Sequence, residues 1–324
     1  MHRLLCLGFL SLLGAASLSG CGSSRSETLD HDPGDWRSQV REIRAGVKGS
    51  EEDPAILRRW DALQRHLEDA TGLPVKFYEA SDYNGIIQAL ASGQIDLASM
   101  GAGSFANIHS QIGDLAVPLF TARDSYGNRG YYSTIVVRSD SEFQTIEDLE
   151  GKSLAFVDFN STSGYIYPRW KMREEGINPD TYFGELAFAG GHSQAIMALA
   201  NGQFDATVLA ANGGSPEHGF SSGSLRRMAR RGMIDASEFR EIWYAGPMAN
   251  SPYVVRADTP QAFRDLIAGA MISLAFEEPE TFMDIGRTPG SYYSPVDVEF
   301  YREIIDMRNR EIQQHRQRFA GRVG

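Results

Sequence analysis

The hydrophobic pattern from residue 40 onward alternates between short apolar runs and longer segments in which apolar residues recur with helical spacing. Residues 40–47 and 75–78 are typical of strands, and residues 54–71 have the period of an amphipathic helix. Gly72 follows this predicted helix directly, where a left-handed cap favours glycine. Strands that alternate with helices predict an α/β fold with a mainly parallel sheet.

An eight-residue segment occurs twice along the chain, with six of its eight positions identical. Residues 89–96 have the sequence ALASGQID, and residues 198–205 have the sequence ALANGQFD. In each copy a helix is predicted to end at the glycine and a strand to begin near the aspartate. Short junctions of this kind also recur by chance. Tyr83 and His192 each precede their copy by six residues, which favours two equivalent helices that begin with a polar aromatic residue.

Helix starts are suited to binding anions. The first backbone N–H groups of a helix have no partner within the helix, and the helix dipole favours negative charge at this end. If the starts near Tyr83 and His192 face each other across a cleft, they form a site for a small anion.

The first residues of the chain predict an export signal and not a part of the fold. A short basic start is followed by an apolar stretch over residues 4–13, which is too short to span a bilayer. The sequence LSGC at residues 18–21 resembles the bacterial lipobox, so we expect a signal peptide over residues 1–20 and lipidation of Cys21. An ordinary signal peptide with an incidental cysteine is the alternative. Residues 21–39 are polar and are expected to be a flexible tether.

Composition indicates a globular, exported protein with a full-sized core. The 324 residues are 42% hydrophobic, a length that allows about two domains. Removal of residues 1–20 would leave Cys21 as the only cysteine, so the core and not disulfides must stabilise the fold. The formal charge of −11 argues against nucleic-acid binding.

A run of hydroxyl residues follows a predicted buried strand between the two copies of the repeat. Residues 145–152 indicate a short helix and a glycine turn, and an apolar strand then leads into Ser161, Thr162, Ser163 and Gly164. These residues are expected to cap the next helix. In isolation such a run is usually only a cap.

Together these segments resemble the phosphonate/phosphite family of substrate-binding proteins of ABC importers. The resemblance covers roughly residues 42–310. The segments that carry it are residues 82–87, 93–101, 130–133, 148–152, 161–164, 191–192 and 251–255. It implies a bilobed type II periplasmic-binding-protein fold with two mixed-sheet α/β lobes and a ligand cleft between them.

The resemblance also implies which residues contact the ligand. Ser161, Thr162 and Ser163 are expected to bind the phosphoryl oxygens through their hydroxyls and backbone amides. Tyr83, Tyr131 and His192 are expected to donate hydrogen bonds to the same group. Neutral hydroxyls and amides bind an anion without a buried full charge. Taken alone, Tyr131 is as readily a packed aromatic residue, and His192 a surface histidine.

The sequence departs from the family at two positions. In relatives that bind aminoalkylphosphonates, carboxylates are expected to pair with the ligand ammonium at the places of Asn212 and Ser251. An ammonium without such a partner would cost about 1–3 kcal/mol or more on binding. We therefore expect Asn212 to favour phosphite, methylphosphonate or phosphate over 2-aminoethylphosphonate. Glu51 and Glu52 would alter this expectation if they reached the cleft.

The expected domain division places residues 40–134 and 250–324 in lobe 1 and residues 135–249 in lobe 2. The chain is expected to cross between the lobes near residues 132–136 and 243–251. The C-terminal stretch 296–317 predicts a long charged helix that packs across the lobe to which it returns. The arginines at 226, 227, 230 and 231 are predicted to form a solvated face, with contact to a transporter subunit or lipid headgroups as the alternative.

Motifs for catalysis are not found in the sequence. There is no nucleophile elbow, P-loop or dinucleotide fingerprint, and the histidines lack metal-ligand spacing. We therefore expect a monomeric lipoprotein without a cofactor, which delivers a small phosphorus oxyanion to the permease and ATPase of an ABC importer. Two alternatives stay open: a periplasmic sensing partner of a membrane kinase or chemoreceptor, and an envelope enzyme that acts on a phosphonate.

Overall fold

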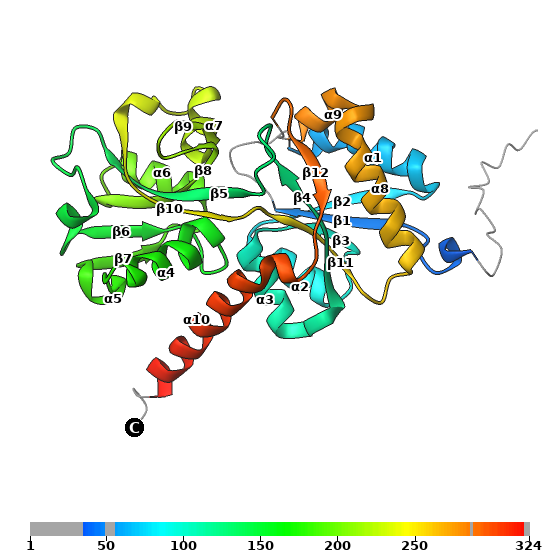
Figure 1. Ribbon diagram of the computed structural model, residues 1–324, viewed down its shortest axis with the longest axis horizontal. Coiled ribbons are helices and arrows are strands. Elements are labelled where there is room, and N and C mark those ends of the chain that lie inside the picture. The colour runs from blue at the N-terminus through cyan, green and yellow to red at the C-terminus, as the bar shows by residue number, and fades with distance from the viewer. Residues whose placement is uncertain (1–34, 49–55, 286–287, 321–324) are drawn as a thin grey trace, which may run out of the picture.

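The structure is a computed structural model, and it describes residues 35–48, 56–285 and 288–320 of the chain. The expected signal peptide, Cys21, residues 21–34 of the tether, and Glu51 and Glu52 lie outside these residues. Within the described part of the chain, strands form two separate sheets, one toward each end of the molecule (Figure 1).

The first sheet is a mixed sheet of six strands in the order β12-β4-β11-β3-β1-β2. Strand β1 is parallel to β2 and β3, whereas β11 runs antiparallel to β3 and β4. The strands are β1 (Ile43–Lys48), β2 (Val75–Ala80), β3 (Leu97–Ser99), β4 (Ala116–Arg123), β11 (Pro252–Arg256) and β12 (Tyr292–Pro295). Strand β1 begins three residues later than predicted. The last residues of the predicted flexible tether are folded: Trp36–Ser38 form a short helical turn that Asp35 caps, and Arg37 donates to the carbonyl of Thr71 at 2.8 Å.

The second sheet is also mixed and has the order β10-β5-β8-β6-β7, with β9 paired to β8. Strand β6 is parallel to β7 and β8, and the long strands β5 and β10 are antiparallel to each other. The strands are β5 (Gly130–Arg138), β6 (Ser153–Phe156), β7 (Glu185–Phe188), β8 (Ala206–Ser215), β9 (Gly219–Gly223) and β10 (Phe239–Ala249). The α/β class with two mixed sheets, which the resemblance implied, is therefore observed. The mainly parallel sheet expected from the alternation of elements is not, because β4, β11 and β12 in the first sheet and β5, β8 and β10 in the second pair antiparallel.

Helices cover both faces of each sheet (Figure 1). Around the first sheet they are α1 (Ile56–Thr71), α2 (Tyr83–Ala91), α3 (Ala102–Ile112), α8 (Gln261–Glu277) and α9 (Pro279–Asp284). Around the second they are α4 (Tyr167–Glu174), α5 (Pro179–Tyr182), α6 (His192–Ala200) and α7 (Ser224–Arg230). Strand β5 shows why both faces must be covered: Ile135 and Val137 point into one apolar cluster, and Val136 points into another.

The repeated sequence forms the same structure twice. Helix α2 ends before Gly93 and helix α6 ends before Gly202, as predicted, and both glycines have a left-handed φ, 72° and 69°. The aspartates of the repeat, Asp96 and Asp205, each bind the neighbouring parallel strand. Asp96 Oδ2 accepts from the backbone N of Arg44 at 2.9 Å, and Asp205 Oδ2 accepts from the backbone N of Ser153 at 2.9 Å. The repeat therefore anchors a helix–strand unit in each half of the molecule.

The chain passes between the sheets through two segments. It leaves the first sheet after β4 and enters the second at Gly130, a few residues before the predicted crossing at 132–136. It returns through residues 250–251, between β10 and β11, within the predicted range. The division into lobe 1 and lobe 2 at residues 134/135 and 249/250 remains a prediction, and its first boundary falls inside β5.

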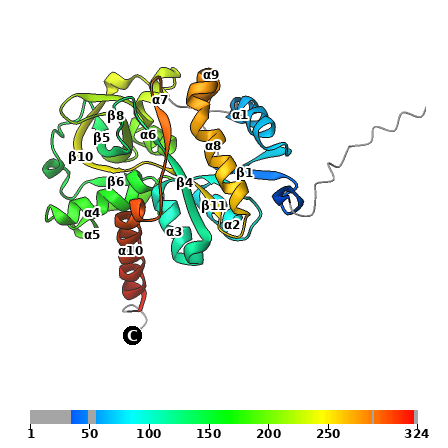
Figure 2. The same ribbon diagram turned by 45° about the vertical axis from the view of Figure 1, so that its right-hand side comes forward.

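The C-terminal helix α10 (Arg302–Ala320) joins the two sides at a third place. Both views show it running away from the junction, with α3 on one side and α4 on the other (Figures 1 and 2). The sequence predicted that this helix would pack across the lobe to which it returns. The prediction was incomplete, because α10 also contacts α4 and the turn at residues 162–166. No helix in the described ranges has the length and apolar character to cross a bilayer.

We predict that Asp205→Ala destabilises the protein. The substitution removes the acceptor for both the backbone N and the Oγ of Ser153, at 2.9 and 2.8 Å, and should lower the free energy of unfolding by about 1–3 kcal/mol. Urea denaturation measures this difference. The control is Asp140→Ala, whose side chain is 82% exposed and which should change stability by less than about 0.5 kcal/mol. Equal unfolding midpoints for the two variants would contradict the prediction.

Candidate functional site

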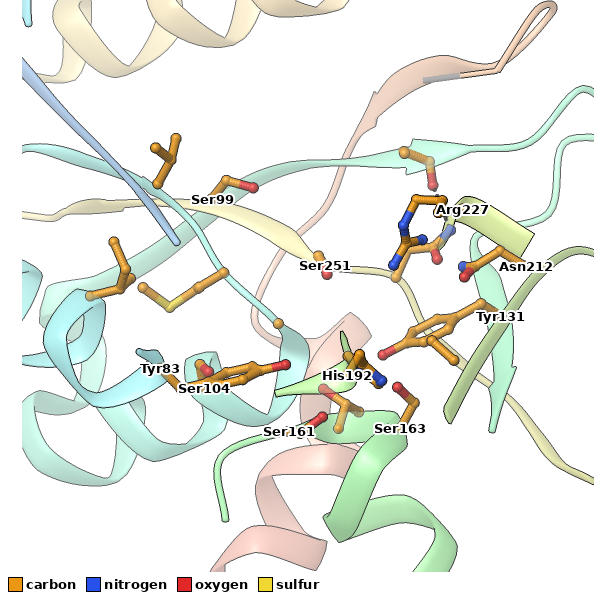
Figure 3. Close-up of a pocket in the computed structure, with 18 of the residues that line it drawn as sticks. Tyr83, Ser99, Ser104, Tyr131, Ser161, Ser163, His192, Asn212, Arg227 and Ser251 are labelled. Atoms are coloured by element: carbon orange, nitrogen blue, oxygen red, sulfur yellow. Dashed lines mark hydrogen bonds between the residues drawn. The ribbon is translucent and has the colours of Figure 1, made fainter. Parts of the chain in front are cut away.

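A cavity of about 350 Å³ lies between the two sheets and is lined from both sides. It contains every residue that the sequence predicted as a ligand contact: Tyr83, Tyr131, Ser161, Thr162, Ser163, His192 and Asn212. In Figure 3, Tyr83 and Tyr131 extend from opposite sides, and their hydroxyls point into the same space above Ser161 and Ser163. The fold therefore gathers into one cavity residues that are far apart in the sequence.

Four helical segments begin at this cavity. Tyr83 is the first residue of α2, and His192 is the first residue of α6, as predicted. Gly101 is the N-cap of α3, and Ser161 is the N-cap of the π-helical turn η4 (Thr162–Ile166) that leads into α4. All four residues line the cavity. Because helix starts carry partial positive charge and orphan N–H groups, their convergence favours an anion.

The loop that we call the hydroxyl loop, residues 158–164, is held mainly by short hydrogen bonds. Ser161 Oγ accepts from the backbone N of Gly164 at 3.1 Å, which caps the turn. Ser133 Oγ donates to the carbonyl of Ser163 at 2.7 Å from strand β5. Asp158 Oδ1 accepts from the backbone N of Asn160 at 2.7 Å. These contacts lie within the protein and fix the backbone of the loop.

Helix α3 of the first side contacts the hydroxyl loop directly. The backbone N of Gly103 donates to Thr162 Oγ1 at 2.7 Å, and Asn107 Nδ2 donates to Asn160 Oδ1 at 2.7 Å. A Cβ atom at Gly103 would lie 2.9 Å from the carbonyl oxygen of Asn160 and 2.6 Å from Cδ1 of Ile166. Only glycine allows this approach. Thr162 Oγ1 already accepts one hydrogen bond. We therefore expect the Thr162 hydroxyl to act toward a ligand as a hydrogen-bond donor.

Helix α10 holds the same loop from its outer side. Arg308 is 1% exposed and donates to the carbonyl of Phe159 and to Asn160 Oδ1, both at 2.7 Å. Its guanidinium also lies 4.0 Å from the ring centroid of Phe159. Burial lowers the pKa of Arg308 to about 10, so the side chain remains charged at neutral pH. Next to it, Glu311 accepts from Tyr165 at 2.9 Å. Buried charged side chains of α10 therefore support the hydroxyl loop from the side away from the cavity.

The two tyrosines are placed to act as neutral hydrogen-bond donors. Burial raises the pKa of Tyr83, although hydrogen bonding to Ser161 acts in the opposite direction. Burial likewise raises the pKa of Tyr131, and hydrogen bonding to Ser163 and Thr162 opposes it. Both phenols therefore keep their protons at neutral pH, and a protonated hydroxyl can donate to an anion.

Asn212 and Ser251 lie on the cavity wall at the positions where the resemblance implied carboxylates in other members. Asn212 belongs to β8 and pairs with Ser222 of β9, and the Ser251 carbonyl accepts from Thr121 Oγ1 at 2.9 Å. No aspartate or glutamate is among the described residues that line the cavity. Glu51 and Glu52 lie outside the described residues.

Arg227 lines the cavity although the sequence predicted another place for it. The arginines of α7 were predicted to form a solvated face, but Arg227 lines the cavity and donates to Ser224 Oγ at 3.2 Å. Two neighbouring arginines lie in other surroundings: Arg226 pairs with Glu241 at 2.7 Å, and Arg230 is exposed. The cavity therefore contains a cationic side chain as well as neutral donors. Within the described ranges, no group of three or more metal-ligating side chains is found.

Comparison with known families identifies one match that covers most of the chain. The family described as "ABC transporter, phosphonate, periplasmic substrate-binding protein" matches residues 46–291. This range contains all of the cavity residues named above.

Individual relatives are more distant. The phosphate-import protein PhnD of Mycolicibacterium smegmatis is 28% identical over 263 residues, which cover 78% of this chain and 75% of that protein. The phosphonates-binding periplasmic protein of Escherichia coli is 25% identical over 261 residues, with 79% and 70% covered. The structure of PhnD1 from Prochlorococcus marinus in complex with methylphosphonate has a TM-score of 0.67 at 15% identity, covering 84% of this chain and 98% of that one. This likeness confirms the predicted fold.

We predict that Gly103→Ala weakens both stability and anion binding. The added methyl group would push the start of α3 away from Asn160 and Thr162 and break the 2.7 Å bond across the cavity floor. Overpacking of this kind costs about 1–3 kcal/mol. The matched control is Gly269→Ala inside α8, where nothing lies within 4 Å of the new Cβ and stability should stay the same or rise. Thermal unfolding and calorimetric titration measure both effects, and a Gly103→Ala variant that behaves like Gly269→Ala would contradict the prediction.

Proposed function

The chain belongs to the family of periplasmic substrate-binding proteins of phosphonate ABC transporters, and from this premise we propose that it captures a small phosphorus oxyanion for delivery to an importer. The family is not enzymatic. The ligand that we propose is phosphite, methylphosphonate or phosphate. The residues that we propose as contacts are Tyr83, Tyr131, Ser161, Thr162, Ser163, His192 and Asn212.

One observation carries the proposal: hydroxyl donors and helix starts converge in a cavity that no described carboxylate lines. A phosphoryl group presents three oxygens, each an acceptor for more than one hydrogen bond. The hydroxyls of Ser161 and Ser163 and the backbone of η4 supply donors from below, and Tyr83 and Tyr131 supply them from the sides (Figure 3). Fixed donors in a partly dehydrated cleft bind an anion strongly, because they need no reorganisation.

The lack of a carboxylate among the described lining residues predicts the order of ligand affinities. An ammonium group would enter without a carboxylate partner among the described lining residues and would lose its hydration. We therefore propose weak binding of 2-aminoethylphosphonate. The names of relatives agree with a phosphoryl ligand without an amine, since one is a phosphate-import protein and another was solved with methylphosphonate.

Delivery requires partners on the membrane. We propose that the monomer presents its ligand to the permease of an ABC importer, whose ATPase subunit drives transport. We also propose that a lipid on Cys21 holds the protein at the membrane, with the residues between Cys21 and the helical turn Trp36–Ser38 as the tether. Labelling with a fatty-acid analogue tests the anchor, which should be lost in Cys21→Ala.

We predict that Ser161→Ala and His192→Ala weaken binding of methylphosphonate and phosphate by about tenfold or more, because each removes a donor to a charged ligand. Isothermal titration calorimetry measures the affinities. Ser92→Ala is the matched control, since Ser92 is exposed and lies at the far end of α2 from Tyr83.

The ligand panel for this experiment contains phosphite, phosphate, methylphosphonate and 2-aminoethylphosphonate. A tightest affinity for 2-aminoethylphosphonate would contradict the proposed ligand order. If no phosphorus anion binds to the unmodified protein, the proposed ligand class is wrong.

A further inference from the structure

The cavity described above has a cationic side chain whose position suggests a second function within the site. Arg227 lines the cavity from α7, on the second-sheet side. In Figure 3, Arg227, Asn212 and Ser251 lie across the open space from Ser161 and Ser163. The cavity thus has a hydroxyl-rich side and, opposite to it, a side with a guanidinium and an amide.

The charge of Arg227 acts within the cavity. Burial is the main cause that raises the pKa of Tyr83, and the positive charge of Arg227 is among the influences that lower it. The guanidinium is therefore close enough for its field to reach the Tyr83 hydroxyl. It donates to Ser224 Oγ at 3.2 Å. A guanidinium has five N–H donors in a planar fork, a geometry that suits an anion with two oxygens.

The chemistry of this side differs from what a hydrogen or methyl substituent requires. A ligand whose phosphoryl group lies on Ser161 and Ser163 directs its substituent away from them, toward the side with Arg227 and Asn212. A methyl group makes no use of a guanidinium fork or of an amide NH₂ group. A carboxylate fits both, because its two oxygens match the planar fork of arginine and accept further bonds.

We propose that Arg227 adds to the ligands proposed above a class that the cavity binds more tightly, phosphonates that carry a carboxylate, with phosphonoacetate as the simplest example. The proposal rests on the proposed function, since it assumes that the phosphoryl group occupies the hydroxyl side. In this arrangement the hydroxyl loop binds the phosphoryl group, and Arg227 with Asn212 binds the carboxylate. No described lining residue carries a negative charge that would oppose the second anionic group.

The test compares phosphonoacetate and methylphosphonate by isothermal titration calorimetry on the exported chain and two variants. Arg227→Gln removes the guanidinium, and Arg230→Gln makes the same change of charge at an exposed position of the same helix that lies outside this cavity. We expect the unmodified protein to bind phosphonoacetate at least about tenfold more tightly than methylphosphonate. Arg227→Gln should abolish this preference by weakening phosphonoacetate much more than methylphosphonate, and Arg230→Gln should keep the preference.

Two results would overturn the proposal. In one, the unmodified protein binds methylphosphonate and does not prefer phosphonoacetate. In the other, Arg227→Gln weakens both ligands equally, which would make Arg227 a phosphoryl contact. If Arg227→Gln does not fold, Arg227→Lys replaces it: this variant keeps the charge but loses the fork, so it should retain only part of the preference. Failure of every phosphorus anion to bind the unmodified protein would instead refute the proposed function.

Discussion

The hydrogen bond from the backbone N of Gly103 to Thr162 Oγ1 joins the two sides of the molecule at the floor of the cavity. It sets how closely the start of α3 approaches the hydroxyl loop, and so which helix starts share one space. The bond depends on a residue without a Cβ, because any larger side chain would meet Asn160 and Ile166. The position of Ser161 relative to the first sheet follows from this contact, together with the support of Arg308 from the other side of the loop.

The charge environment of the cavity differs from the net charge of the protein. The chain has a formal charge of −11, yet its cavity combines helix starts, protonated phenols and one arginine. Net charge describes the solvent-exposed surface, where long-range interactions are screened by salt within about 10 Å. Oriented amides and hydroxyls act at hydrogen-bond distance, so an acidic protein can offer an anion a favourable site. The arginine adds to this field a full charge that net composition conceals.

Local rules explain which parts of the site were predictable. Glycine conformation and capping follow from a few adjacent residues, so the repeat located the starts of α2 and α6, and the hydroxyl run located the cap at Ser161. The place of Arg227 in the cavity could not be predicted. Residues 226–231 contain four arginines, and only tertiary packing determines which of them lines the cavity. The start of α3 contributes backbone N–H groups, which leave no side-chain signal. The alternation of elements predicted the α/β class, but the sheet orders and the reach of α10 depend on distant contacts.

Helix α10 gives the molecule a kinematic constraint that two connecting segments alone would not impose. The two connecting segments define one axis for rotation of the two sides. Helix α10 contacts both sides away from that axis. Any such rotation must therefore shift α10 relative to at least one side. The connection is hydrogen-bonded to both sides. Arg308 donates to the carbonyl of Phe159 on the second side. Tyr301, just before α10, packs on Phe105 of α3 and donates to the carbonyl of Asn250 at 3.0 Å, between β10 and β11. A rotation of one side against the other therefore has to break directional bonds as well as slide apolar surfaces.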